Sequence, residues 1–460
     1  MGANKMLKTE YLLKNFSFNP SPTIIIITFM FIMVGFFIFV FSSQANAVQK
    51  EKYLSYPPTK FAVITDTHIF EIINNEKSLL YKNYGVEERK ILSLSTEILQ
   101  RAVEKIIKRN NIDFVILTGD LTDSGDIKSH KAVAKILQTF PDNGINIFII
   151  PGNHDGFNTQ NYNMEAFSRE IVTPELFREI YYNFGYKQAI YEDNNSLSYV
   201  VEPVKGLWFL MIDSCIYNSK ESYHVCNGRI RKTTQKWIYD ILNKASNNNK
   251  LVFGAVHHSI LEHYRGHQKY FSQYIIDDWK KISSDFAQQN LKIVFTGHHH
   301  AQDIVKKEFD NDTFVYDIET SSLIGYPNAF RLIEITNNNK MTVHSKYIKE
   351  VPSFSDDFTK YTKKIVRDRV KNMAEVKLKK FHLNSYSQEK ISNNAADAII
   401  AHYKGDEKAP ASLNINGLNT WSKFVYSFYK NLLSSLYQDL EPDDLEIEID
   451  LKTGDWTSLE

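Results

Sequence analysis

Short apolar runs rich in β-branched and aromatic residues recur along the chain as far as residue 348. Continuous runs of this kind are typical of strands that are buried on both faces. The early runs alternate with helical stretches at 87–109 and 129–139, whereas the later runs follow one another directly. We therefore predict an α/β fold with two mixed sheets inside and helices outside. The predicted strands are 61–65, 114–118, 145–150, 207–212, 251–256, 292–296, 314–318, 330–335 and 341–348.

Five of the predicted strands end in short polar motifs. In open α/β sheets the carboxyl ends of the strands form the edge where ligands bind, so these motifs are expected to meet. Glycines in three of them permit tight turns and a close approach of the backbone. The motifs are Asp66-Thr67-His68, Gly119-Asp120-Leu121-Thr122-Asp123, Gly152-Asn153-His154-Asp155, His257-His258 and Gly297-His298-His299-His300.

The spacing inside two motifs predicts which side chains act together. In an extended segment, residues i and i+2 point to one side and residue i+1 points to the other. Asp66 and His68 are therefore expected to share a target. By the same rule His298 and His300 face the target, while His299 turns away and its replacement by alanine should be nearly neutral. Mixed carboxylate and imidazole ligands predict a metal centre for Mn, Fe, Zn or Ni.

This set of motifs resembles the calcineurin-like metallophosphoesterase superfamily between about residues 60 and 348. The resemblance implies a four-layer αββα sandwich, two mixed sheets flanked by helices, and two divalent metal ions. The stretch GDLTDSG at 119–125 is similar to the class III cyclic-nucleotide phosphodiesterase branch. By this resemblance, Asp66, His68 and His300 hold the first ion, Asn153, His257 and His298 hold the second, and Asp120 bridges both.

The resemblance also implies roles for the neighbouring residues. A hydroxide held between the two ions would attack phosphorus in line. His154 is expected near the leaving group, as a general acid or as a positive charge. Asp155 is expected to orient the imidazole of His154, to cap the turn, or to do both. Asp123 is interpreted as a cap or as a support for a metal ligand.

Two polar loops either line the substrate site or lie in solvent. The first, at 156–173, follows the third motif and could shape the pocket. The second, at 260–271, carries His263, Arg265 and His267, of which the arginine suits a phosphate group. For this second loop a solvated, basic conformation is the favoured interpretation.

The predicted activity is hydrolysis of a small phosphoester. A phosphodiesterase acting on a cyclic nucleotide or a related small phosphodiester is favoured by GDLTDSG. The alternatives are an exported phosphomonoesterase or nucleotidase, and a non-catalytic metal-dependent scaffold. Because 54 basic residues balance 54 acidic ones, we expect no binding to nucleic-acid polymers.

The N-terminal segment predicts export. Lysines precede an uncharged apolar run at 24–41, and Ala-Asn-Ala follows it. Residues 1–47 are predicted to be a signal peptide or an N-terminal membrane anchor, with membrane contact only through 24–41 if that segment is uncleaved. The protein is accordingly expected to be periplasmic, secreted or membrane-anchored on the extracytoplasmic side. Cys215 and Cys226 either form one disulfide or stay reduced.

The remainder of the chain divides into three predicted parts. Residues 48–350 form the catalytic domain. Residues 351–440 form a small helical module, because amphipathic stretches recur at 356–381, 387–404 and 419–440. Residues 441–460 form an acidic tail that is either a short edge strand or a solvated end.

Overall fold

The computed structural model describes residues 55–71, 89–109, 111–156, 172–217, 225–408, 410 and 413–459. All of them belong to one unit, Ser55–Glu460. The predicted signal or anchor at 1–47 lies outside the described residues, and so does most of the loop 156–173. Within the described ranges, no helix has both the length and the apolar character that a membrane span requires.

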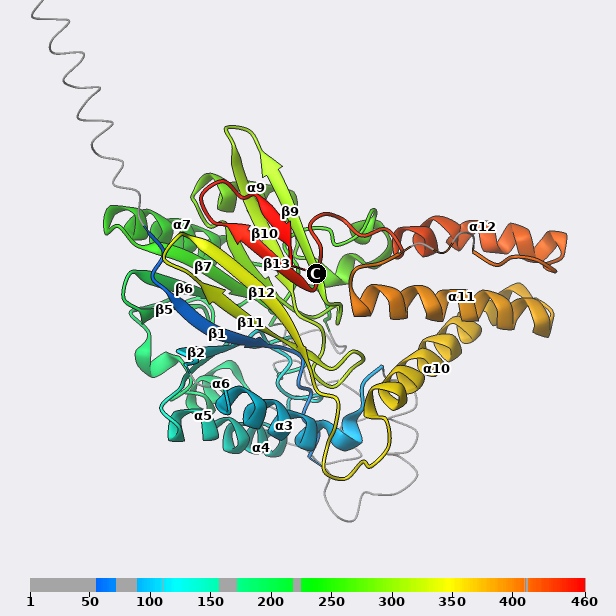
Figure 1. Ribbon diagram of the computed structural model, residues 1–460, viewed down its shortest axis with the longest axis horizontal. Coiled ribbons are helices and arrows are strands. Elements are labelled where there is room, and N and C mark those ends of the chain that lie inside the picture. The colour runs from blue at the N-terminus through cyan, green and yellow to red at the C-terminus, as the bar shows by residue number, and fades with distance from the viewer. Residues whose placement is uncertain are drawn as a thin grey trace, which may run out of the picture. The chain divides into compact units, whose positions relative to one another are not determined.

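Two mixed sheets of seven strands form the centre of the fold (Figure 1). In the first sheet the order is β14-β13-β12-β11-β1-β2-β3; β1 pairs in parallel with β2 and β2 with β3, and the other neighbouring strands pair antiparallel. In the second the order is β4-β5-β6-β7-β8-β10-β9, with β6, β7, β8 and β10 parallel. The strands of the first sheet are β1 (Thr59–Ile64), β2 (Phe114–Leu117), β3 (Asn146–Ile149), β11 (Ala329–Ile335), β12 (Lys340–Tyr347), β13 (Glu446–Asp450) and β14 (Trp456–Ser458). Those of the second are β4 (Tyr191–Glu192), β5 (Tyr199–Val204), β6 (Leu207–Ile212), β7 (Leu251–Val256), β8 (Ile293–Thr296), β9 (Asp303–Phe309) and β10 (Thr313–Glu319).

The two sheets pack face to face through a layer of aromatic side chains. Phe61 of β1 stacks on Phe114 of β2 with ring centroids 4.8 Å apart, and it meets Phe209 of β6 and Phe295 of β8 edge-on at 5.4 Å each. Because strand residues alternate, Trp208 points to the opposite face of the second sheet, where helices cover it. The predicted sandwich of two mixed sheets is therefore confirmed.

Helices lie on the outer faces of the sheets. Ile238 of α7 and Ile282 of α9 pack on the outer face of the second sheet, and α3 to α6 lie beside the first sheet (Figure 1). Asp126 caps the start of α4, because its side chain accepts a hydrogen bond from the amide of Ser129. These helices are α3 (Ser95–Ile107), α4 (Ile127–Leu137), α5 (Thr139–Asp142), α6 (Pro174–Ile180), α7 (Lys232–Asn247), α8 (His267–Phe271) and α9 (Trp279–Gln288), with 3-10 turns η1 (Leu92–Leu94), η3 (Tyr186–Gln188) and η4 (Ser272–Tyr274).

The helical module is inserted between two neighbouring strands of the first sheet. It contains α10 (Phe358–Leu378), η5 (Lys379–Phe381), α11 (Ser385–Lys404) and α12 (Thr420–Ser435), which share an apolar cluster of their own (Figure 1). The chain leaves the sheet after β12 and returns as β13, which pairs with β12. Ile447 and Ile449 of β13 are fully buried. Part of the acidic tail predicted at 441–460 is thus strand, paired into the first sheet.

Candidate metal centre

The five polar motifs lie at one edge of the two sheets, and hydrogen bonds join their loops. Within the first sheet, the amide of Asp66 donates to the carbonyl oxygen of Gly119 at 3.1 Å. Within the second, the amide of Gly297 donates to the carbonyl oxygen of His257 at 3.0 Å. A third hydrogen bond joins the two sheets, because the amide of His298 donates to Oδ2 of Asp66 at 3.0 Å. Both sheets therefore contribute to a single cluster of polar side chains.

Several residues of this cluster have a left-handed backbone conformation. The φ angles are 52° at Asp66, 37° at His68, 75° at His298 and 72° at His300. The predicted pairing of residues i and i+2 is retained, but the extended conformation assumed for it is wrong. Residues other than glycine seldom adopt positive φ, because their Cβ crowds the backbone. Such backbone strain is typical of functional sites, where the surrounding structure holds it in place.

Asp66, His68 and His300 form the first group of possible ligands. Oδ1 of Asp66 lies 3.2 Å from Nε2 of His300 and 3.4 Å from Nε2 of His68, and these two nitrogens are 3.4 Å apart. This Oδ1 is buried and has no hydrogen-bond partner. A buried carboxylate oxygen left without a partner is costly. The three atoms converge as ligands of one divalent ion would.

Asp120, Asn153, His257 and His298 form the second group. Nε2 of His257 lies 3.4 Å from Oδ1 of Asp120 and 3.1 Å from Oδ1 of Asn153, and His298 offers a ligand atom to the same group. The Nδ1 atom of His257 lies 2.7 Å from the carbonyl oxygen of Thr118, to which it donates. That bond leaves the lone pair on Nε2 for the group, as is usual for a metal-binding histidine.

Asp120 lies between the two groups and faces both of them. Its Oδ1 is the oxygen beside His257, whereas its Oδ2 lies 3.6 Å from Nε2 of His68. Oδ2 is buried without a hydrogen-bond partner, and Oδ1 also accepts from the amide of His154 at 2.8 Å. A carboxylate in this position can place one oxygen on each of two cations and offset their repulsion. The structure thus brings together all seven residues predicted as metal ligands.

The charges in this cluster suit cations. Burial raises the pKa of the Asp66 carboxyl group, but the imidazoles of His300 and His68 outweigh burial and hold this pKa well below its usual range. Burial lowers the pKa of His257, because it disfavours the charged imidazole. The carboxylate of Asp120 has the larger effect and raises this pKa to about 9. Burial lowers the pKa of His300 to about 4. Ionised carboxylates therefore lie beside imidazole nitrogens, and a metal ion would displace the proton from His257 on binding.

The sequence pattern of the calcineurin-like phosphoesterases matches residues 59–302, slightly more than half of the chain. The chain belongs to this family. Membership implies a phosphoester hydrolase with two divalent metal ions, and the two groups of ligand atoms, with Asp120 facing both, fit such ions.

Curated relatives resemble this calcineurin-like phosphoesterase over short stretches. A protein of Vesicomyosocius okutanii named as a cyclic nucleotide phosphodiesterase is 39% identical over 67 residues, which are 15% of this chain and 28% of the relative. A protein of Arcobacter nitrofigilis named as a glycerophosphodiester phosphodiesterase is 30% identical over 159 residues, 33% of this chain and 45% of the relative. The chain thus spans less than half the length of each. A solved dimetal phosphatase from Danio rerio is 12% identical and covers 63% of this chain and 96% of its own, with a TM-score of 0.45.

His154 stands beside the first group of ligands with its ring fixed in place. Its Nδ1 lies 2.8 Å from the carbonyl oxygen of Asp123 and donates to it. The rings of His154 and His68 meet edge-on with centroids 4.9 Å apart. A histidine held in this way can carry a proton on its Nε2 atom near a bound phosphoester.

Asp155 takes the turn-capping role, one of the alternatives predicted for it. Its carboxylate accepts hydrogen bonds from the amides of Leu121 at 3.1 Å, Thr122 at 2.8 Å and Gly152 at 2.9 Å. Both oxygens are used in this way, so Asp155 does not orient the imidazole of His154. The carboxylate caps the turn instead and ties the second motif to the third.

Asp123 supports a ligand, and it does so together with a residue that no motif indicated. Oδ1 of Asp123 lies 3.6 Å from Nδ1 of His68 and accepts a hydrogen bond from Nζ of Lys90 at 2.6 Å. Lys90 is itself buried. Its position in the sequence carries no signal, because it lies in a segment with neither a metal-binding motif nor a glycine turn.

The second histidine of the His257-His258 pair points away from the cluster. Nδ1 of His258 lies 2.7 Å from the hydroxyl of Ser214, and Nε2 lies 3.0 Å from the carbonyl oxygen of Cys226. Both Cys226 and Cys215 are free thiols in the structure. His257 alone of the pair belongs to the candidate centre.

The loop 260–271 is not the solvated, basic loop that its composition suggested. The side chains of His263 and His267 are buried, and Arg265 is the exposed member of the three. Nδ1 of His263 lies 2.7 Å from Oδ1 of Asp303 at the start of β9. The prediction is wrong because a carboxylate forty residues away along the chain meets this histidine and makes its burial favourable.

His299 turns away from the metal ligands as predicted, and its side chain is buried. Its ring lies against those of Tyr274, His267 and His402, with centroids 4.7, 5.1 and 5.0 Å away. His299→Ala should therefore lower the free energy of unfolding by about 2 kcal/mol, because it leaves a cavity and removes a buried contact to His402. Urea denaturation of the wild type and the variant measures this loss. Equal midpoints would support the neutral effect expected from the sequence.

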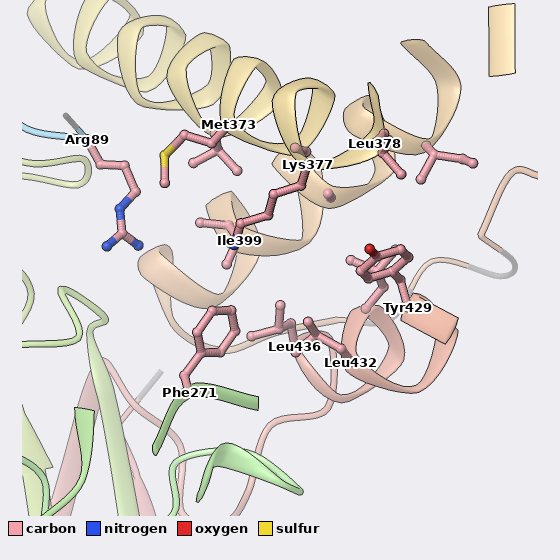
Figure 2. Close-up of a pocket in the computed structure, with 14 residues that line it drawn as sticks. Arg89, Phe271, Met373, Lys377, Leu378, Ile399, Tyr429, Leu432 and Leu436 are labelled. Carbon is pink, nitrogen blue, oxygen red and sulfur yellow. The ribbon is translucent and has the colours of Figure 1, made fainter. Parts of the chain in front are cut away.

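An apolar cavity of about 150 Å³ lies in the helical module (Figure 2). Residues of α10, α11 and α12, such as Ile399, line most of it, and none of its lining residues is an acid or a histidine. Arg89 and Phe271 line it as well. The guanidinium of Arg89 donates to the hydroxyls of Tyr403 and, at 2.9 Å, Tyr274. The cavity therefore adjoins the candidate centre through these two tyrosines but cannot itself hold a metal.

Proposed function

We propose that this calcineurin-like phosphoesterase hydrolyses small phosphodiesters with two divalent metal ions at the candidate centre. The observation that carries the proposal is the position of Asp120, whose two carboxylate oxygens face two different groups of ligand atoms. The proposed ligands are Asp66, His68 and His300 for one ion, Asn153, His257 and His298 for the other, and Asp120 for both.

Two divalent ions supply positive charge that activates water and offsets the charge of the phosphoryl oxygens. The chain itself supplies the arrangement of the groups around them. The negative charge of Asp120 lowers the repulsion between the cations. His154, held through its Nδ1 by the carbonyl oxygen of Asp123, can give a proton from Nε2 to the departing oxygen. Lys90 and Asp123 keep the ring of His68 in position.

A preference for diesters over monoesters has two supports. The stretch GDLTDSG at 119–125 contains Asp120 and Asp123 and resembles the cyclic-nucleotide phosphodiesterase branch. Both curated relatives described above are also named as phosphodiesterases. The competing function is a phosphomonoesterase or nucleotidase, which the same metal centre could support.

A substrate panel separates these functions. The full chain would be loaded with Mn²⁺, and kcat/KM would be measured for bis-p-nitrophenyl phosphate, p-nitrophenyl phosphate and 3′,5′-cyclic AMP. We expect faster hydrolysis of a diester than of the monoester, and a strong loss of hydrolysis in a matched Asp120→Asn chain. Equal or faster monoester turnover would overturn the preference for diesters. Inactivity toward all three with Mn²⁺, Zn²⁺ and Fe²⁺ would instead favour a scaffold.

A further inference from the structure

A second cluster of buried, chargeable side chains lies where α11 meets the edge of the second sheet. Asp303 is the first residue of β9, His402 lies in the last turn of α11, and Glu407 follows that helix. Their side chains are 3%, 1% and 2% exposed. Nδ1 of His402 lies 2.5 Å from Oε1 of Glu407 and 3.5 Å from Oδ2 of Asp303. One atom from each residue therefore converges on the same small volume.

Two carboxylate oxygens in this region have no hydrogen-bond partner among the described residues. Oε2 of Glu407 is buried and has no hydrogen-bond partner. Oδ1 of Asp439, which lies in the segment after α12, is in the same situation. Buried carboxylate oxygens in proteins are normally paired or coordinated to a metal, since an isolated one is costly. The oxygen of Glu407 belongs to a carboxyl group that contacts His402, and this combination points to a cation.

Further carboxyl groups lie near these three residues. Asp439 belongs to a second acidic group with Asp406 and Asp444. The buried guanidinium of Arg331 also lies nearby, but its hydrogen bonds run to carbonyl oxygens and a hydroxyl and not to these carboxyl groups.

The two ring nitrogens of His402 contact another imidazole on one side and two carboxyl groups on the other. Its Nε2 lies 3.3 Å from Nδ1 of His299. A neutral imidazole donates only one hydrogen bond, so a tautomer that donates from Nε2 to His299 leaves the lone pair of Nδ1 beside Asp303 and Glu407. Because Nδ1 of His402 and Oε1 of Glu407 lie 2.5 Å apart, either a shared proton or a cation must then join them. A metal-bound histidine shows this same pattern, with its second nitrogen donating to a neighbouring group.

We propose that Asp303, His402 and Glu407 bind one divalent cation in addition to those of the candidate metal centre. One imidazole and two carboxylates suit Zn²⁺ or Mn²⁺. The ion joins β9 at the edge of the second sheet to the end of α11 and so fastens the helical module to the catalytic domain. Through His402 it also supports His299, which lies between two proposed ligands of the reaction centre.

Metal counting tests this site. The full-length wild type, Glu407→Gln and a control variant, Glu389→Gln, would be loaded with Zn²⁺, freed of excess ion and analysed by mass spectrometry. Glu389 also lies on α11, but its side chain is 64% exposed. We expect Glu407→Gln to hold one ion fewer per chain than the wild type and the control. Equal counts in all three would overturn the proposal and favour a protonated His402 paired with two carboxylates.

Anomalous diffraction from wild-type crystals at the zinc edge tests the site without any substitution. We expect a peak between Asp303, His402 and Glu407. Peaks at the reaction centre with none here would overturn this inference and leave the proposed function intact. A peak here with none at the reaction centre would do the reverse. The test therefore stands even if Glu407→Gln fails to fold.

Discussion

Asp120→Asn is expected to reduce kcat/KM for phosphoester hydrolysis by about 10³-fold or more, since losing several kcal/mol of charge stabilisation corresponds to such a factor. The substitution is nearly isosteric, so the packing around residue 120 should survive. The amide carries no negative charge, however, and one of the two oxygens becomes a nitrogen that donates hydrogen bonds. That nitrogen would point at imidazole nitrogens of either His68 or His257, which lie 3.6 and 3.4 Å from the two oxygens.

Metal content measured beside activity identifies the cause of this loss. The Asp120→Asn chain should hold at least one ion fewer than the wild type under the same loading conditions. Asp240→Asn is a suitable control, because this aspartate lies on α7 with its side chain 55% exposed. Circular dichroism would verify that both variants fold. Hydrolysis by Asp120→Asn at the rate of the control would contradict the proposed centre.

The seven proposed ligands were predictable because their positions follow from the order of strands and motifs. Each motif comes directly after an apolar run, and parallel strands deliver their carboxyl ends to one edge. The pairing of His298 with His300 was also predictable, but the reason given for it was wrong. The left-handed backbone at both residues depends on hydrogen bonds such as that from the amide of His298 to Asp66, which crosses between the two sheets.

The residues behind the ligands were not predictable, because their partners lie far away in the chain. Lys90 meets Asp123, and His402 meets His299 across 103 positions. A local pattern of charge contains no information on such contacts. The loop 260–271 illustrates the same difficulty, since His263 is buried by Asp303. Composition alone made it resemble a solvated loop.

The helical module shows what the periodicity of apolar residues can predict and what it cannot. The expected helices at 356–381, 387–404 and 419–440 correspond to α10, α11 and α12 with only small shifts at the ends. Their amphipathic pattern could not reveal that the chain afterwards returns to the first sheet as β13. Strand pairing between β12 and β13 is a long-range interaction, and it holds both ends of the module against the catalytic domain.

His154→Gln should lower kcat by about 10²- to 10⁴-fold, the usual contribution of a positioned general acid, while leaving metal content unchanged. Glutamine can still donate a hydrogen bond but cannot deliver a proton. The backbone amide of residue 154, which donates to Oδ1 of Asp120, is unaffected by the change. The ligands themselves should therefore stay in place, in contrast to the effect of Asp120→Asn.

The leaving group distinguishes a general acid from a residue that only supports the metal centre. An alkyl phosphodiester has a poor leaving group that needs a proton, whereas p-nitrophenolate departs without one. The loss in His154→Gln should accordingly be larger for the alkyl diester than for bis-p-nitrophenyl phosphate. Asp123→Asn serves as a comparison, because that side chain contacts His68 while the carbonyl oxygen that holds His154 belongs to the backbone. An equal loss for both substrates would assign His154 a purely electrostatic role, since a charge on the transition state acts whatever group departs.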